Sequence, residues 1–175
     1  MCPSETLETL RARLFERIRE ALIRIAVRRP PDQIIGGAED PYLCRWYVLP
    51  RNRWLNIYLH QFLRPDDDRA LHDHPWFWAS WLLFGDYCEH TIKAGGIHHR
   101  HWRREGSLRV SSPWRAHRIE LIESAGVFLT CWTLFITGPR MREWGFHCPQ
   151  AGWVHWRGFT DPSDSGVTGR GCGDV

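Results

Sequence analysis

The first thirty residues carry apolar side chains at a helical spacing. Between Ser4 and Arg29 leucine and isoleucine recur at three- and four-residue steps, and arginine and glutamate fill most other positions. This spacing predicts an amphipathic helix with Ser4 as its N-cap, ended by Pro30 and Pro31. We expect the helix segment, residues 1–31, to pack on the remaining domain through the apolar stripe of Leu7, Leu10, Leu14, Ile18, Leu22 and Ile25.

After Gly36 and Gly37 the apolar positions change to a period of two. Short turns separate these runs, and no helical period lies between them, which favours an all-β antiparallel sandwich or barrel over βαβ units. The jelly-roll double sheet is the closest common architecture. We expect residues 32–159 to form it and residues 160–175, rich in Gly, Ser and Asp, to be a mobile tail. The predicted strands are 43–49, 54–63, 76–84, 87–92, 107–110, 117–122 and 127–137.

Composition places the chain among folded single domains. It has 175 residues, of which 43% are hydrophobic and 25% charged, so one core is expected. Eleven tryptophans are unusual, and although each one is expected to serve the core, a group beside histidines would form an aromatic pocket. A net charge of +3 is far below that of dedicated nucleic-acid binders, so we predict no nucleic-acid partner.

Cysteine spacing and the N-terminus predict a cytoplasmic protein. No C-x-x-C pair and no hydrophobic signal segment occur, so we expect all six cysteines to be reduced thiols. No run approaches the roughly 18 apolar residues of a membrane span, and no membrane association is predicted. Phosphate-loop, dinucleotide-binding, nucleophile-elbow and H-E-x-x-H motifs do not occur, which disfavours nucleotide and serine hydrolases. The cysteines are Cys2, Cys44, Cys88, Cys131, Cys148 and Cys172.

The tripeptide His72-Asp73-His74 carries the clearest chemical signal. On a strand, residues two apart project to the same face, so both imidazoles should point inward and Asp73 outward. His117 opens a later strand with alternating apolar residues. Together the three histidines predict one divalent metal site, and the alternative is three unrelated histidines with structural roles.

These residues resemble the two motifs of the cupin superfamily over roughly residues 54–136. The resemblance implies a cupin-type double-stranded β-helix, or jelly-roll, barrel with a metal inside it, bound by His72, His74 and His117. Two departures stand out: Trp78 and Ala79 occupy the usual position of a glutamate ligand, and the glycine usual before the last histidine is missing. The matching positions are His72, His74 and Gly85 for the first motif and Gly106, Pro113 and His117 for the second.

A three-histidine site without a carboxylate is similar to that of the thiol dioxygenases within the cupins. That likeness implies ferrous iron with open coordination positions, although imidazole also suits zinc and nickel, and manganese stays an alternative. Our first hypothesis is a metal-dependent cupin enzyme, a non-haem iron dioxygenase acting on a small molecule. The alternatives are an isomerase or hydrolase with redox-inert Zn, Ni or Mn, and a non-catalytic ligand-binding or assembly module. A homodimer formed through the N-terminal helix is the alternative to that helix covering a sheet edge. The C-terminal stretch 137–157 also resembles small cupin-like proteins of bacteria and phages.

Several residues are expected around this site. Asp68 and His147 are candidates for a fourth ligand or an outer partner of a metal-bound imidazole. Tryptophans would form dry walls, and arginines would bind a substrate carboxylate through their guanidinium fork. Each has a simpler alternative: a solvated turn aspartate, a core tryptophan, a surface arginine. The candidates are Trp76, Trp78, Trp132, Arg64, Arg109 and Arg140.

Overall fold

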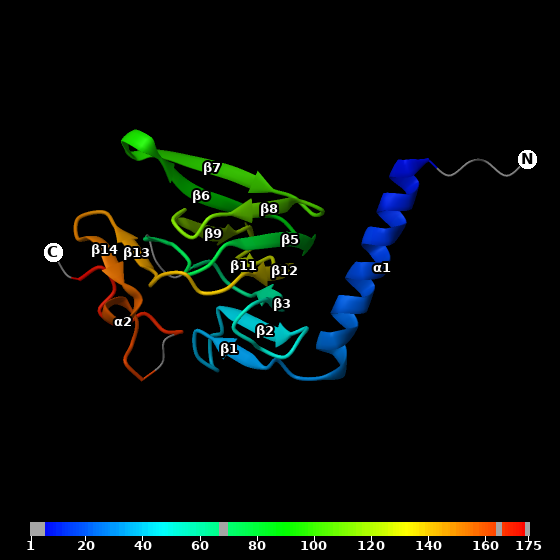
Figure 1. The fold of residues 1–175 in the computed structure, drawn as a ribbon, viewed down its shortest axis with the longest axis horizontal. Helices are drawn as coiled ribbons and strands as arrows, with labels where there is room; N and C mark the ends of the chain where they lie inside the picture. The colour runs from blue at the N-terminus through cyan, green and yellow to red at the C-terminus, as the bar shows by residue number, and fades with distance from the viewer. Residues whose placement is uncertain (1–5, 67–69, 164–165, 174–175) are drawn as a thin grey trace, which may run out of the picture.

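The chain folds into two antiparallel six-stranded sheets with a helix on one side (Figure 1). The structure is a computed structural model that describes residues 6–66, 70–163 and 166–173. The first sheet contains, in order across it, β1 (Gln33–Ile35), β2 (Leu43–Tyr47), β3 (Asn56–Phe62), β12 (Cys131–Thr137), β5 (Trp78–Phe84) and β8 (Leu108–Ser111). The second contains β14 (Gly152–His155), β13 (Gly145–Cys148), β4 (Leu71–His72), β9 (His117–Leu121), β6 (Tyr87–Lys93) and β7 (Ile97–Arg103).

The two sheets are not closed into a barrel. Within the described ranges no strand pairs with members of both sheets, and β10 (Glu123–Ser124) with β11 (Val127–Phe128) forms a separate small ribbon. The predicted closed barrel is therefore wrong, while a mostly β domain with antiparallel sheets and an N-terminal helix is confirmed. Alternation of apolar residues predicts strands and their buried faces, but closure depends on edge-strand pairing, which alternation does not encode.

The core lies in two layers, one on each face of the first sheet. Residues between the sheets include Leu43, Phe62, Leu82 and Ile119. The layer on the opposite face packs under the helix. It contains the buried residues Leu22, Trp46, Leu59 and Leu83. The change from Leu82 to Leu83 shows the strand period directly, since neighbouring leucines serve different layers.

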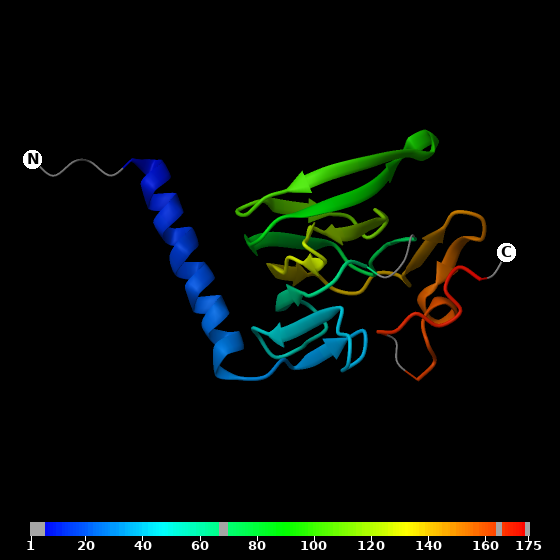
Figure 2. The ribbon, with the colours of Figure 1, turned by 180° about the vertical axis from the view of Figure 1, so that it is seen from behind.

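The helix α1 (Leu7–Arg28) lies beside the first sheet (Figure 2) and packs on it through residues from Phe15 to Ala26. Its N-cap is Thr6, whose side chain accepts a hydrogen bond from the backbone of Thr9, and the predicted cap Ser4 lies outside the described residues. Leu22 is buried, whereas the side chains near the start of the helix, Leu7, Leu10 and Leu14, are exposed. No helix in the described part of the chain combines the length and apolar character needed to span a bilayer.

The C-terminal segment folds back on the second sheet. After β14 comes the short helix α2 (Trp156–Phe159), and the backbone N–H groups of Gly169 and Gly171 both donate to the Phe159 carbonyl. Cys148 and Cys172 form a disulfide, so the prediction that all cysteines are reduced is wrong for this pair. The two cysteines lie 24 residues apart in the sequence, and no local motif indicates that they pair.

The other cysteines and the C-terminal tail can be compared with the predictions as well. Cys44, Cys88 and Cys131 are free thiols, and Cys2 lies outside the described residues. The tail was expected to be mobile, yet its described residues are held by the disulfide and by hydrogen bonds to α2. The boundaries at residues 31 and 159 stay predictions.

Candidate metal centre

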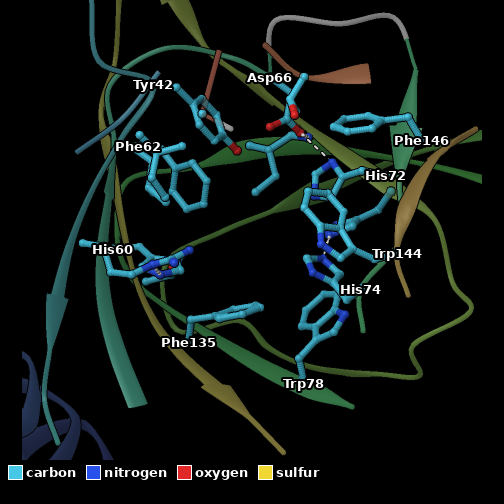
Figure 3. Close-up of a pocket in the computed structure, with 18 of the residues that line it drawn as sticks. Tyr42, His60, Phe62, Asp66, His72, His74, Trp78, Phe135, Trp144 and Phe146 are labelled. Carbon is cyan, nitrogen blue, oxygen red and sulfur yellow. Dashed lines mark hydrogen bonds and ion pairs between the residues drawn. The ribbon is translucent and has the colours of Figure 1, made fainter. Parts of the chain in front are cut away.

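Strand pairing brings the three predicted metal ligands together. His72 of β4 lies directly across the ladder from His117 of β9. His74 follows just after β4, where its backbone N–H donates to the carbonyl of Pro113 at 3.2 Å. Because positions 72 and 74 share a side of the chain, both imidazoles turn toward the space between the sheets (Figure 3).

The distances between the imidazoles suit one metal ion. One nitrogen from each ring lies within 4.8 Å of the other two, and the Nε2 atoms of His74 and His117 are 2.8 Å apart. Imidazole nitrogens that share a metal at ~2.1 Å lie roughly 3.0–3.4 Å from one another, so small side-chain rotations would complete the geometry. The donor set, three imidazoles and no carboxylate, fits iron, zinc, nickel or copper.

Burial keeps the imidazoles of His74 and His117 neutral, as metal binding requires. Desolvation lowers the pKa of His74 and of His117 well below the usual value. Neighbouring charge acts in the same direction, from His72 on both rings and from Arg109 on His117. The lone pairs therefore remain available across the neutral pH range.

Two carboxylates outside the trio lie beside its rings. Glu89 of β6, 1% exposed, holds its Oε1 atom 2.9 Å from Nδ1 of His117, which leaves Nε2 of that ring facing the other histidines. Asp66 places its Oδ2 atom 3.8 Å from Nδ1 of His72 (Figure 3). Such outer partners fix the tautomer and raise the basicity of metal-bound imidazoles. Asp68, predicted for this role, lies outside the described residues.

Asp73 turns away from the trio and is buried against the C-terminal strands. Its carboxylate accepts hydrogen bonds from the backbone N–H of Gly145 at 2.9 Å, and from Trp153 at 3.0 Å. Burial raises its pKa, but bonds to His147, Arg142 and Gly145 outweigh that effect and lower it to about 2. His147 thus lies 3.1 Å from Asp73, and the structure does not bring it to the metal ligands.

A cavity of about 330 Å³ opens between the sheets in front of the histidines. Trp76 and Trp78 line it, as predicted from the sequence, and the Trp78 ring stacks on His117 with centroids 4.9 Å apart. Trp132 does not line it. Its ring stacks on Trp46 under α1, because in β12 the side chain of position 133 faces the cavity and that of position 132 faces the helix.

The three predicted arginines lie outside the cavity wall. Arg64 pairs with Asp40, and Arg140 pairs with Glu143 at the surface. Arg109 is buried behind Trp78 and forms an ion pair with Glu89. None of these guanidinium groups faces the cavity, so the structure does not bring them to a position for binding a substrate.

Arg45 of β2 is the arginine that lines the cavity, and the sequence analysis missed it. Its Nε–H donates to Nε2 of His60 at 2.9 Å, and its NH1 donates to Gln33 at 3.1 Å. Among the described residues no carboxylate forms an ion pair with it. Desolvation lowers the pKa of Arg45, and desolvation with the Arg45 charge lowers that of His60 well below the usual value. The sequence did contain one signal for Arg45, because it is a charged residue within the otherwise uncharged strand Leu43–Tyr47.

His60 and Arg45 stand across the cavity from the histidine trio. Figure 3 shows Tyr42, His60 and Phe62 on one side and His72, His74 and Trp144 on the other. The cavity therefore has a histidine cluster on one wall and a cationic group among aromatic rings on the opposite wall. A small molecule that reaches from one to the other would need an anionic group and an apolar body.

The chain matches no protein-family model and no curated protein sequence. Solved structures of similar shape include Fe(II)-HppE with the alternative substrate (S)-1-HPP, 14% identical, TM-score 0.46, covering 62% of this chain and 58% of that one. A variant of the oxalate decarboxylase of Bacillus subtilis is 16% identical, TM-score 0.44, with 64% and 27% covered. A putative mannose-6-phosphate isomerase from Ralstonia eutropha JMP134 is 16% identical, TM-score 0.47, with 62% and 93% covered.

These structural neighbours are cupin-fold proteins. The aligned part spans less than two thirds of the HppE chain, and each TM-score is below 0.5. Likeness at this level carries no conclusion about activity. The case for a function therefore rests on this chain's own residues.

Proposed function

We propose that this chain is a metal-dependent enzyme of the cupin type that acts on a small anionic molecule. His72, His74 and His117 would hold one divalent metal, with ferrous iron favoured over zinc, nickel or manganese. Ferrous iron in such a site supplies the redox chemistry of a non-haem dioxygenase. The observation that carries the proposal is the convergence of three imidazoles, one buried and two partly buried, on the wall of a cavity.

The outer partners of the imidazoles support a metal centre over three unrelated histidines. If the rings only filled space in the core, no particular group would be expected beside their nitrogens. Instead, Glu89 lies 2.9 Å from Nδ1 of His117 and Asp66 lies 3.8 Å from Nδ1 of His72. Glu89 lies within hydrogen-bond distance of Nδ1 of His117, so Nε2 of that ring, which faces His74, is the nitrogen that would bind the metal. This is the arrangement expected around metal-bound histidines.

Arg45 supports an anionic substrate. Its guanidinium lies in the cavity wall, and the described residues that it bonds are neutral, so it offers charge and free N–H groups to a carboxylate or phosphate. Trp78 and Phe135 provide an apolar surface between Arg45 and the metal ligands. These residues would orient the molecule and exclude water while the metal side reacts.

Elemental analysis of protein purified without chelator or added metal is the first test. The wild type should contain one equivalent more iron than His72→Ala or His117→Ala. His155→Ala, at a histidine that pairs with Glu143 away from the cavity, is the matched control and should keep the wild-type content. Equal metal in all four proteins would contradict the proposal, and zinc or nickel in place of iron would favour the redox-inert isomerase or hydrolase.

Oxygen consumption tests the reaction class and Arg45 together. Iron-loaded protein should consume oxygen with at least one member of a set of small thiols and aromatic carboxylic acids. Arg45→Gln should then raise KM about tenfold or more for a carboxylate substrate, because a charge-assisted pair contributes ~1.5–3 kcal/mol. The matching amide substrate should bind both proteins equally. No oxygen consumption with any member would overturn the dioxygenase reading.

A further inference from the structure

The outer face of the second sheet carries a separate cluster of metal-ligating side chains. Glu89 and His117 point inward from β6 and β9, so their strand neighbours Cys88, His90 and Glu120 point to the opposite face. In the strand register Cys88 lies across from Glu120. The sheet therefore brings a thiol, an imidazole and a carboxylate together on the side away from the cavity.

The three groups are close enough to share one ion. One ligand atom from each lies within 4.8 Å of the other two, and His90 Nε2 is 2.5 Å from Glu120 Oε2. Ligand atoms around a tetrahedral zinc lie roughly 3.5 Å apart, so opening the His90–Glu120 contact by about 1 Å would admit the metal. Cys88 and His90 are 1% and 3% exposed, while the Glu120 side chain is 38% exposed and leaves an approach from solvent.

His98 of β7 orients the imidazole of this cluster. Its Nε2 lies 2.8 Å from Nδ1 of His90, and the two rings stack with centroids 5.0 Å apart. With a metal bound, Nδ1 of His90 would donate its hydrogen to Nε2 of His98, which leaves the lone pair on Nε2 of His90 for the ion. Metal-bound histidines usually have such a second partner on the other ring nitrogen.

We propose that Cys88, His90 and Glu120 form a second metal site, selective for zinc or a similar borderline-soft ion, with His98 as a positioning residue. Thiolate and imidazole ligands exclude magnesium and calcium, which bind through oxygen. The two negative charges of Cys88 and Glu120 balance the charge of the dication. The site is independent of the proposed function, because it lies on the other face of β6 and β9.

Two arginines set an upper limit on its affinity. Arg100 lies 3.4 Å from Glu120 Oε1, and Arg118 lies 3.9 Å from Glu120 Oε2. Their positive charge repels a dication at this site. We therefore expect weaker binding than at a closed site with four cysteine or histidine ligands.

Cobalt(II) titration of the metal-free full chain tests this site without interference from the three-histidine centre. Cobalt bound to a thiolate gives a charge-transfer absorption in the near ultraviolet, and the inner centre has no sulfur ligand. At saturating cobalt the wild type and His72→Ala should both show this band with the amplitude of one thiolate-bound cobalt per chain, and zinc should abolish it. Cys44→Ser, which removes a free thiol in β2, is the matched control and should keep the band.

Three variants test the ligands Cys88 and Glu120 and the positioning residue His98. Cys88→Ser should lose the band, and Glu120→Gln and His98→Ala should bind cobalt about tenfold or more weakly. Glu120 and His98 are at the surface, so their variants test the site even if Cys88→Ser fails to fold. Absence of the band in the wild type, or unchanged cobalt affinity in Glu120→Gln, would overturn the proposal.

Discussion

Glu89 is a buried carboxylate that connects a proposed metal ligand to two arginines. Its Oε1 atom lies 2.9 Å from His117, and its Oε2 atom accepts two hydrogen bonds from Arg103 at 2.9 and 2.8 Å. Arg109 forms an ion pair with the same carboxylate. The negative charge thus sets the tautomer of His117 and neutralises cations that are largely removed from water.

Replacing Glu89 by glutamine should weaken both metal binding and folding. We expect zinc affinity at the inner centre to fall about 10–100-fold and the free energy of unfolding to fall by roughly 3 kcal/mol, since buried arginine loses its partner. Calorimetric titration and urea unfolding measure the two effects. Glu143→Gln, which breaks an exposed pair with Arg140, should change stability by less than about 1 kcal/mol and leave zinc affinity unchanged. A folded Glu89→Gln protein with wild-type affinity would exclude the orienting role.

His60 should make the protein less stable in mild acid. Burial, then the Arg45 charge, lowers its pKa well below the usual value, whereas the unfolded residue titrates near ~6.5. Below that pH the unfolded chain binds a proton that folded His60 does not. The free energy of unfolding therefore falls as pH falls, by up to about 1.4 kcal/mol per pH unit.

Urea unfolding between about pH 7.5 and 5 tests this contribution. His60→Gln should reduce the slope of stability against pH by up to one proton's worth. Cys44→Ser removes a thiol whose pKa is raised by burial and which stays protonated over this range, so it should leave the slope unchanged. Equal slopes in His60→Gln and the wild type would show that His60 takes up its proton in the folded protein too.

A site residue could be predicted where the pattern of its own strand identifies it. His72 and His74 were predictable because the strand period places both on one face, and His117 because it begins an alternating strand. Glu89 and Arg45 were not, because their roles arise from partners on other strands. Trp132 was assigned to the wrong face, since an aromatic strand in contact with both layers gives no clear period.

At the scale of elements, local signals predicted α1 closely and the C-terminal segment poorly. The helix begins at Leu7 and ends at Arg28, near the predicted bounds, because caps and prolines are local features. The predicted strands leave out the residues between 92 and 107, but β7 lies there and pairs with β6 along its length. The tail lacks a period of its own, and its position depends on Cys148 and Phe159.

The disulfide should hold the C-terminal segment against the cavity. Val167 and Thr168 line that cavity, and Cys172 anchors the chain just after them. Cys172→Ser should therefore increase hydrogen exchange at Gly169 and Gly171, whose N–H groups bond to Phe159, and lower stability by roughly 3 kcal/mol on the chain-entropy account. Exchange mass spectrometry measures the first effect and urea unfolding the second.

Cys44→Ser is the matched control for the disulfide variant. It replaces a free cysteine in β2, so the amides of Gly169 and Gly171 should keep their wild-type protection. If Cys172→Ser also keeps that protection, hydrogen bonds to Phe159 alone hold the segment, and the disulfide does not restrain the cavity wall.

At the scale of the whole molecule, the second sheet carries both proposed metal sites on its two faces. The inner face presents His72 and His117, and the outer face presents His90 and Glu120. Among the described residues a single pair, His72 with His117, joins β4 to β9. A metal at the inner centre would therefore add a cross-link where the strand pairing is shortest.

Zinc should stabilise the folded protein through this cross-link, because the unfolded chain cannot assemble the three imidazoles. At a free zinc concentration 100 times Kd, a single site adds about 2.7 kcal/mol, which for a chain of this length raises Tm by roughly 5–10 °C. Glu120→Gln removes a ligand of the outer site, so thermal unfolding of that variant with and without zinc reports the inner centre. Adding His72→Ala should remove most of the shift. If the double variant keeps the full shift, zinc stabilises the fold elsewhere, and the three histidines are not its site.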